Sequence, residues 1–278
     1  MSANKLIRDQ NLYIQNHNSN ELVNLFRDTI NKPELIVKGD TIRELEDRQI
    51  LIYPQFPFQD FETRKYDINY FKKEMLWKLT GDPYDTSIEQ HAKIWKSVKN
   101  SDGSFNSNYG QYWFGQQMGL FKAFNELVID PQTRRACIPM LSTKHLGHGV
   151  SDTVCTGHIS FRIRDGFLNM SVAMRSSDQV FGLGTDIPTF SVLQQIMLGM
   201  INTVHHFTAL GTMSITADSS HIYQRHFNMI ETLLNNRECI TSQLSFPEIG
   251  SAEAFKLAAC KGKVDPTWGK FSKWLLEI

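Results

Sequence analysis

The sequence predicts one α/β domain in which helices cover a large mixed β-sheet, and three observations support this fold class. Residues 159–174 alternate apolar and polar side chains around Asp165–Gly166, which is a strong short-range signal for a β-hairpin. Residues 68–79 have helical spacing of apolar side chains, and a glycine followed by proline at 81–83 ends that helix. Other strand-like and helix-like segments succeed one another along the 278 residues without an internal repeat.

The composition is that of an ordinary soluble globular protein, with 41% hydrophobic and 21% charged residues. The 29 basic and 29 acidic residues cancel, so no overall field favours nucleic acid or a membrane surface. No apolar run reaches the roughly 18 residues of a membrane span, and the N-terminus does not resemble a signal peptide. The four cysteines lack a CxxC pair, which favours reduced thiols and a cytoplasmic location. We therefore expect a small polar metabolite as the partner, and neither nucleic acid nor a membrane.

The remaining elements are expected from periodicity and from capping residues. Before the hairpin we expect a helix over 19–30, strands over 34–38 and 49–53, helices over 68–79 and 87–98, a helix that follows residues 108–113 and ends near 128, and a strand over 136–141. After it we expect a helix over 188–204, a strand over 207–216 and a helix that opens at 219–226. Ser19 is expected to cap the first helix, and the charged residues 41–48 to separate the first two strands. The pattern is unclear over 238–261, and the apolar C-terminal end is expected to dock.

A possible site lies at the open end of the predicted hairpin. Cys155 stands just before one arm, and Arg175-Ser176-x-Asp178 follows the other. Because an antiparallel hairpin places these two ends side by side, a thiol, a guanidinium, a hydroxyl and a carboxylate would meet there.

Cys155 has two other interpretations. It could be an inert small hydrophobe at a strand end, rather than a nucleophile whose thiolate is favoured by Arg175. It could also bind zinc, since His145-x-x-His148 is followed by Cys155-x-x-His158. Residues three apart on a strand face opposite sides, which disfavours the metal site, and we expect none.

Glu74 and the pair Arg134-Arg135 each have an ordinary explanation and a functional one. Glu74 could lie on a solvated helix face, or be half-buried beside Trp77 with a raised pKa and manage protons. The two arginines could simply occupy an exposed turn, or clamp a phosphate with their guanidinium forks.

Three residues after the hairpin also have ordinary structural explanations. Asp186 could cap a helix that begins near Pro188. His221 and Tyr223 could be first-turn residues of the helix predicted after Ser219.

Taken together, these motifs resemble the thymidylate synthase superfamily over about residues 68 to 232. The matching elements, in the family's order, are Glu74-x-x-Trp77-x-x-x-Gly81-Asp82, Trp95, Tyr109-Gly110, Arg134-Arg135, Cys155, Arg175-Ser176-x-Asp178, Gly182 and His221-x-Tyr223-x-x-His226. The resemblance implies a thymidylate synthase-like fold and a homodimer that packs sheet against sheet.

The resemblance also implies a chemistry and a role for each residue. In the family, a cysteine adds to C6 of a pyrimidine nucleotide and makes C5 nucleophilic towards the methylene group of 5,10-methylenetetrahydrofolate. Cys155 would be this nucleophile, and Glu74 would organise the proton-transfer water network. The implied binding residues are Arg175 and Ser176 for the phosphate, Arg134 and Arg135 for the same phosphate from the other subunit, His221 and Tyr223 for the sugar, Tyr109 and Trp95 in the cavity wall, and Asp178, Trp95 and Gly182 at the folate.

Two departures from the family's pattern are informative. Val154-Cys155-Thr156 stands where thymidylate synthases generally have Pro-Cys-His. Gly182-Leu-Gly-Thr-Asp186 stands where they have Gly-Leu-Pro-Phe followed by an asparagine that recognises uracil. A carboxylate accepts from the amino group of cytosine and, if protonated or bridged by water, also satisfies N3. Asp186 therefore favours a cytosine base.

The same aspartate occurs in phage-type deoxycytidylate hydroxymethylases, which this chain also resembles in Ser-Asp-x-x-Cys-Thr, Asn-Ser-Asn-Tyr-Gly and Met-Arg-Ser-x-Asp-x-Val-Phe-Gly. In those enzymes water adds to an exocyclic methylene intermediate, giving 5-hydroxymethyl-dCMP and tetrahydrofolate. The resemblance implies a nucleotide-biosynthesis enzyme for phage DNA modification, in the cytoplasm of a bacterial host if phage-encoded. Alternatives are a C5 methylase that makes 5-methyl-dCMP or dTMP, a CMP-specific hydroxymethylase and a silent nucleotide-binding relative. Lys38 and Arg43 are weak candidates for a further phosphate contact.

Overall fold

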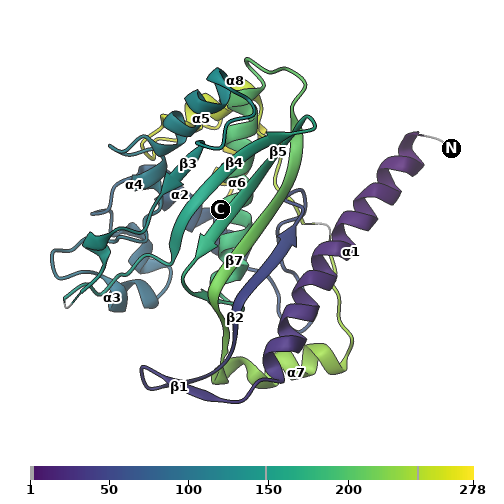
Figure 1. Ribbon diagram of the computed structural model, residues 1–278, viewed down its shortest axis with the longest axis vertical. Coiled ribbons are helices and arrows are strands. Elements are labelled where there is room, and N and C mark those ends of the chain that lie inside the picture. Colours follow the sequence, from purple (N-terminus) through teal and green to yellow (C-terminus); the bar gives the residue numbers. More distant parts are fainter. Residues whose placement is uncertain (1–2, 148, 243) are drawn as a thin grey trace. The chain divides into compact units, whose positions relative to one another are not determined.

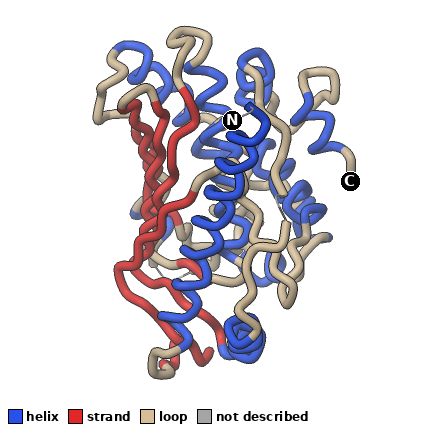
Figure 2. The backbone as a smooth tube through the Cα atoms, turned by 90° about the vertical axis from the view of Figure 1, so that its right-hand side faces the viewer, coloured by secondary structure: helices blue, strands red, loops and turns tan. Residues whose placement is uncertain are grey.

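A computed structural model describes residues 3–147, 149–242 and 244–278, and shows an α/β protein (Figures 1 and 2). The strands are β1 (Leu35–Val37), β2 (Asp40–Ile52), β3 (Cys137–Pro139), β4 (Thr156–Arg164), β5 (Phe167–Met174), β6 (Ser177–Asp178) and β7 (Ala209–Tyr223). The α-helices are α1 (Ala3–Ile30), α2 (Ile68–Thr80), α3 (Ile94–Val98), α4 (Gly110–Trp113), α5 (Gly119–Ile129), α6 (Gly182–Ile201), α7 (Phe227–Asn235), α8 (Ser251–Ala258) and α9 (Lys270–Leu276). Short 3-10 helices are η1 (Ser87–Gln90), η2 (Thr143–His145) and η3 (Gln224–His226).

The strands form a mixed sheet, which confirms the predicted fold class. Its strand order is β1-β2-β7-β5-β4-β3, and β6 pairs with β7 outside this path. The pairs β1–β2, β2–β7 and β3–β4 are antiparallel, whereas β6 and β7 run parallel. No helix among the described residues is long and apolar enough to cross a membrane.

The chain divides into two compact units, each assembled from three separate segments. The first unit comprises Met1–Tyr66, Met174–Ser191 and Thr212–Ser245, and the second comprises Asp67–Ala173, Val192–Gly211 and Phe246–Ile278. Both α6 and β7 contribute residues to the two units. We describe each unit by itself.

In the first unit, the N-terminal helix is much longer than the predicted 19–30 helix. Ser19 is therefore not a cap, and its buried hydroxyl accepts the backbone N–H of Ile240 at 3.0 Å. The neighbouring Asn18 amide donates to the Tyr53 carbonyl at 2.8 Å and accepts the Tyr53 N–H at 2.9 Å. These polar side chains have partners far along the chain, so they anchor the middle of α1 instead of starting it.

The predicted break between two strands at 41–48 is wrong, because β2 runs through the charged segment. Its backbone pairs with β7 from Ile42 to Ile52, and Glu44 lies opposite His221. Arg48 pairs with Asp28 of α1 at 3.4 Å. Charged side chains are accommodated because much of this strand is only partly buried, while its backbone hydrogen bonds are made to a distant segment.

The helix predicted to open at 219–226 is also wrong. Strand β7 continues to Tyr223, well beyond the predicted 207–216, and helix α7 begins only at Phe227. Ser220 and His221 pair with β2 on one side and with β6 on the other. Two ladders of backbone hydrogen bonds outweigh the local capping signal of the serines.

In the second unit, the two most strongly predicted elements are confirmed. The β4–β5 hairpin turns at Asp165 and Gly166, whose φ angles of 52° and 77° suit a two-residue turn. Asp67 caps α2 by accepting the Tyr70 N–H at 2.9 Å. Gly81 ends that helix in the left-handed conformation with φ 61°.

Other predicted helices have different extents. The 87–98 helix is split into η1 and α3, whereas the helix expected to end near 128 is α5, which is preceded by the separate short helix α4. Between the latter pair, Met118 adopts a left-handed conformation with φ 49°, and a Cβ at Gly115 would overlap the Gln111 backbone. Helix α6 begins before the predicted 188 and carries Pro188 inside it. The 136–141 strand is reduced to β3 around Pro139.

The C-terminal end docks as expected. Phe271 and Leu275 of α9 are fully buried. The first turn of this helix is capped from α8, where the buried Glu253 carboxylate accepts both the N–H and the hydroxyl of Ser272 at 2.7 Å.

Candidate functional site

The predicted site residues fall into two groups, one in each compact unit. The second unit holds Glu74, Trp95, Tyr109, Arg134, Arg135 and Cys155. The first unit holds Arg175, Ser176, Asp178, Gly182, Asp186, His221 and Tyr223.

Glu74 is buried in the second unit, so its interpretation as a solvated helix residue is wrong. Its carboxylate lies 2.6 Å from the Lys78 ammonium one helical turn later, and both side chains are at most 7% exposed. The Lys78 ammonium also lies over the Tyr109 ring, 5.3 Å from its centroid. Removal from water strengthens such interactions, so the pair fixes the Glu74 carboxylate in one orientation. Lys78 was missed in the sequence, although its spacing of four from Glu74 is a usable signal.

Trp95 belongs to an aromatic cluster formed with Trp77 and Phe105. The ring centroids of Trp77 and Trp95 are 4.8 Å apart, and Phe105 meets both rings edge-on. The Trp95 indole donates to the Tyr70 hydroxyl at 3.0 Å. Since Trp77 and Tyr70 are both on α2, this cluster holds Trp95 against the helix that carries Glu74.

The segment at Tyr109–Gly110 is fixed on the C-terminal end of the same helix. A Cβ at Gly110 would overlap the Lys78 carbonyl oxygen, so the close approach requires glycine. The buried Asn108 amide donates to the Trp77 carbonyl at 3.1 Å and to the Asp82 carbonyl at 3.0 Å. Tyr109 is 5% exposed, and this packing places its ring beside Lys78.

Cys155 is half-buried, is not part of a disulfide and lies immediately before β4. Its interpretation as an inert core residue does not fit this partial exposure. The loop before it is held by Asp152, whose carboxylate accepts the N–H of Ser107 at 2.7 Å and its hydroxyl at 2.5 Å. The Asp152 N–H donates to the Asn100 side chain at 3.0 Å. Asp152 was not singled out from the sequence, although it belongs to the Ser-Asp-x-x-Cys motif.

Arg134 and Arg135 are exposed in the turn before β3. The Thr133 N–H donates to the Asp130 carbonyl at 2.9 Å, and the Thr133 hydroxyl accepts the Arg135 N–H at 3.1 Å. The turn is therefore ordered by its backbone, while two guanidinium groups extend from it.

The alternative zinc site has little support in the second unit. Both ring nitrogens of His145 already have partners: Nδ1 accepts the Ser142 N–H at 3.1 Å, and Nε2 lies 3.0 Å from the Tyr112 hydroxyl. Burial, assisted by Lys144, lowers the pKa of His145 to about 4. His148 lies outside the described residues. Within the described part of the chain, no group of three or more His, Cys, Asp or Glu residues is placed to hold a metal.

In the first unit, β6 brings Asp178 beside His221. The two residues are partners in the parallel β6–β7 ladder, and the Gln179 N–H donates to the His221 carbonyl at 2.9 Å. The Asp178 carboxylate accepts the Val180 N–H at 3.0 Å. Burial lowers the pKa of His221, while Asp178 and Glu44 oppose this shift, so a neutral imidazole is favoured near neutral pH.

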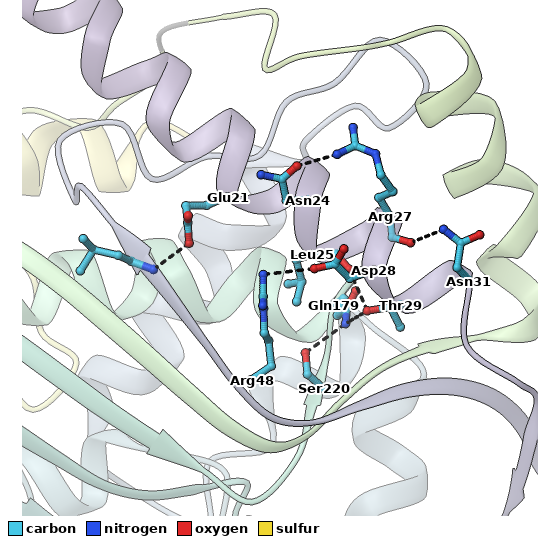
Figure 3. A network of polar contacts seen from close by, with 11 residues as sticks. Glu21, Asn24, Leu25, Arg27, Asp28, Thr29, Asn31, Arg48, Gln179 and Ser220 are labelled. Carbon is cyan, nitrogen blue, oxygen red and sulfur yellow. Dashed lines mark hydrogen bonds and ion pairs between the residues drawn. The ribbon is translucent and has the colours of Figure 1, made fainter.

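Gln179 attaches this segment to helix α1 (Figure 3). Its buried amide donates to the Thr29 hydroxyl at 2.6 Å and to the Ser220 hydroxyl at 3.0 Å. The Thr29 hydroxyl in turn donates to the Leu25 carbonyl at 2.8 Å. The N-terminal helix therefore positions residues on both sides of Gln179.

His221 and Tyr223 lie on one face of β7, since they are two residues apart on a strand. Their rings meet edge-on with centroids 5.0 Å apart. The Ser219 hydroxyl lies 3.3 Å from His221 Nδ1, and the Arg225 guanidinium lies 4.0 Å from the Tyr223 ring centroid. His221 is therefore held by Ser219 of the same strand, and Tyr223 by Arg225 of η3, directly after the strand.

Asp186 lies inside α6, so its interpretation as the cap of a helix starting near Pro188 is wrong. The helix opens at Gly182, where a Cβ would lie 3.4 Å from Asp178 Cβ. Asp186 is half-buried and shares the first unit with Arg175, Ser176 and His221.

A sequence model of the thymidylate synthase family matches residues 51–261, a range that includes both groups of site residues. The chain belongs to this family, which confirms the resemblance inferred from its motifs.

Similar curated proteins include the deoxycytidylate 5-hydroxymethyltransferases of Enterobacteria phages T2 and T4. Each is 28% identical to this chain, over 179 and 172 residues respectively. The matches cover 61% and 58% of this chain, and 72% and 70% of the relatives. Family and relatives together support one-carbon transfer to C5 of a pyrimidine as the class of reaction.

Proposed function

We propose that this enzyme transfers a one-carbon unit from 5,10-methylenetetrahydrofolate to C5 of dCMP and captures water, giving 5-hydroxymethyl-dCMP. The observation that carries the proposal is Asp186, which replaces an amide by a carboxylate at the position where the family recognises the base. Its compact unit also contains Arg175, Ser176 and His221, the groups assigned to phosphate and sugar. The names of the phage relatives agree with this substrate.

Cys155 begins the reaction in this proposal. Its thiolate forms a bond to C6, and the electron pair of the C5–C6 double bond makes C5 nucleophilic. The folate supplies an electrophilic methylene group at which C5 forms its new carbon–carbon bond. Cleavage of the bond between this methylene carbon and the folate nitrogen, together with loss of the C5 proton, would release tetrahydrofolate and leave an exocyclic methylene on C5. Water would then add to this methylene, and the Cys155–C6 bond would break, which regenerates the thiolate. The half-buried thiol before β4 is compatible with such reversible addition.

Glu74 controls the proton transfers. Its carboxylate is buried and held by Lys78 at 2.6 Å, so it can order a water molecule without swinging away. The Trp77–Trp95–Phe105 cluster keeps bulk water from the adjoining helix and stabilises its position.

The first unit binds the nucleotide. Arg175 and Ser176 contact the phosphate, and His221 with Tyr223 contacts the sugar hydroxyl. The Asp186 carboxylate accepts from the amino group of cytosine, whereas the carbonyl O4 of uracil would oppose it with a second acceptor. The unfavourable contact discriminates against dUMP.

The residues assigned to the folate are chemically suitable for a pterin. Among the described residues, the Asp178 carboxylate accepts one hydrogen bond, from Val180, and thus retains capacity for N–H donors of a ligand. Gly182 lies close to Asp178 and has no side chain to cover it, and Trp95 offers an aromatic face.

A homodimer completes the proposal. Arg134 and Arg135 are exposed on an ordered turn, where their guanidinium groups could reach the phosphate bound by a second copy. The enzyme acts on free nucleotides in the cytoplasm.

Mass spectrometry of products from dCMP, CMP and dUMP, each incubated with methylenetetrahydrofolate, tests the proposal. We expect a hydroxymethyl adduct of dCMP together with tetrahydrofolate. A methyl product with dihydrofolate would show instead that hydride reaches the intermediate, and a preference for CMP would change the assigned sugar. No product from any of the three nucleotides would contradict the proposed function.

A further inference from the structure

Arg64 is a buried arginine to which neither the chemistry above nor the family motifs assign a role. It is 9% exposed and lies in the first unit. One guanidinium nitrogen donates to the Gln59 carbonyl at 3.0 Å, and another donates to the Val180 carbonyl. Arg64 therefore connects the segment before α2 to the backbone that joins β6 to α6.

The same guanidinium packs against the first turn of α6. A Cβ at Gly184 would collide with a terminal nitrogen of Arg64, so any other residue at this position would displace the guanidinium from its hydrogen bonds. Gly184 is also one of the departures from the family's Gly-Leu-Pro-Phe pattern. The buried arginine gives this departure a physical reason, because a larger residue would occupy the space of the guanidinium.

The charge of Arg64 is costly to bury and is only partly compensated. Burial lowers the pKa of its guanidinium, and Tyr66, Asp178 and Asp60 oppose this shift. An arginine remains protonated under these conditions. A hydrophobic side chain would often stabilise such a position equally well, so a geometrical role explains the arginine better than stability does.

Arg64 contacts Val180 and Gly184, which lie on either side of Phe181 in the turn that precedes Asp186. Val180 is held by a hydrogen bond, and Gly184 is held by packing. The N–H of Thr185, the residue after Gly184, donates to the Phe181 carbonyl at 3.2 Å in the first turn of the helix. A rotation of this turn would therefore redirect the Asp186 side chain.

We infer that Arg64 is a positioning residue that sets the direction of Asp186 through Val180 and Gly184, and thereby determines the preference for cytosine over uracil. The inference rests on the proposed function, since it gives Asp186 the task of recognising the base. It differs from a stabilising role because it predicts a change in selectivity, which global destabilisation does not produce.

The test compares Arg64→Met, Arg64→Lys and Gly184→Ala with the wild type. For each protein we would measure kcat/KM for dCMP and dUMP and, by calorimetry, the Kd of each nucleotide. We expect Arg64→Met and Gly184→Ala to lower the dCMP-to-dUMP ratio by about ten-fold or more, since small misplacements of a recognition group are costly. Arg64→Lys should lose less, since it keeps the charge but not the fork.

The double variant Arg64→Met/Gly184→Ala tests the contact itself. Once the guanidinium is gone, the new Cβ meets no obstacle, so the double variant should be no worse than Arg64→Met alone. Independent, multiplying effects would refute the proposed link through Gly184.

Asn18→Ala is the matched control for stability. Asn18 is buried in the same unit and makes backbone hydrogen bonds, but it contacts Tyr53 and Phe56 and not the turn before Asp186. It should lower Tm and leave the dCMP-to-dUMP ratio unchanged. If Arg64→Met and Arg64→Lys likewise lower Tm and leave the dCMP-to-dUMP ratio unchanged, Arg64 is merely structural and the inference is wrong. A wild type that converts neither nucleotide would refute the proposed function instead, and calorimetric preference for dCMP would still report on Arg64.

Discussion

Two carboxylates with central roles in the proposed chemistry are held in opposite ways. Glu74 is fixed from within its own helix, by Lys78 one turn away. Asp178 is fixed by a strand of two residues whose hydrogen-bonding partners lie on β7, more than 40 residues later. The first arrangement is local and can form with α2, whereas the second exists only after distant segments have assembled.

The supports of the two regions differ in the same way. Helix α2 carries its own start and stop signals, Asp67 and Gly81. The segment from β6 to α6 depends on Gln179 bound to α1 and on Arg64 bound to Val180. We therefore expect the region around Glu74 to tolerate distant mutations, whereas the segment from β6 to α6, to which we assign nucleotide recognition, should be sensitive to residues that never touch a ligand.

The most severe change is Cys155→Ala, which should remove chemistry from the second unit and leave nucleotide recognition in the first. We expect product formation to fall at least about 10⁴-fold, because the variant lacks the thiolate that adds to C6 in the proposed mechanism. The Kd for dCMP should change by no more than a few-fold. Product analysis and calorimetry measure the two effects.

Cys137→Ala is the matched control, because it removes an exposed thiol from β3 in the same unit. It should keep wild-type turnover. Substantial activity in Cys155→Ala would overturn the assignment of the nucleophile.

Asp186→Asn changes the first unit alone and should shift the base preference from cytosine towards uracil. An amide can accept from N3–H of uracil and donate to O4, so kcat/KM should shift towards dUMP by roughly 10²–10³. Competition between dCMP and dUMP in one reaction gives the ratio directly.

Asp178→Asn makes the same change from carboxylate to amide in the same unit. It should weaken the binding of methylenetetrahydrofolate and leave the preference for dCMP over dUMP unchanged. An unchanged base preference in Asp186→Asn would mean that another residue recognises the base.

Glu74→Gln tests whether the second region is truly self-contained. Loss of the carboxylate removes the counter-charge of the buried Lys78 ammonium, which should cost about 3 kcal/mol of unfolding free energy and most of the turnover. Glu74→Gln/Lys78→Met should recover most of the stability but none of the activity. Urea unfolding and steady-state kinetics separate these effects.

The pair Lys99–Glu89 is a useful control, since it is equally short at 2.7 Å but more exposed. Glu89→Gln should cost less than about 1 kcal/mol. The role assigned to burial would be contradicted if Glu74→Gln and Glu89→Gln lost equal unfolding free energy. It would also be contradicted if Glu74→Gln/Lys78→Met were as unstable as Glu74→Gln alone.

The smallest expected effect is a pH dependence of stability from His145, whose pKa is lowered from 6.5 to about 4, mainly by burial. The unfolded chain then binds more protons between these two pH values, so the contribution of His145 is full above pH 6.5 and is lost as pH falls towards 4. It should amount to at most about 3 kcal/mol. Urea unfolding at pH 7 and pH 4.5 measures the loss.

His145→Gln should reduce this pH dependence, because a glutamine can accept the Ser142 N–H without titrating. His91→Gln, at an exposed position in the same unit, should leave it unchanged. A slope in His145→Gln equal to that of the wild type would show that His145 titrates normally.

The family was recognisable from the sequence because its motifs depend on residue type and order. Cys155, Glu74 and the Arg175-Ser176-x-Asp178 series identified the family without any geometry, and Asp186 suggested the base. Asp152, which holds the loop before Cys155 through Ser107, was not recognised from the sequence. Residues that only support a functional group carry no pattern of their own, since their partners lie elsewhere in the chain.

The sequence by itself determined the elements whose stability is local: the β4–β5 hairpin with its Asp165–Gly166 turn, and α2 between Asp67 and Gly81. Only the tertiary structure decided that β2 continues through its charged segment and that His221 belongs to a strand. Propensity and capping signals amount to about 1 kcal/mol or less for each residue. Ladders of backbone hydrogen bonds and burial between distant segments outweigh them, and a local pattern contains no information about those partners.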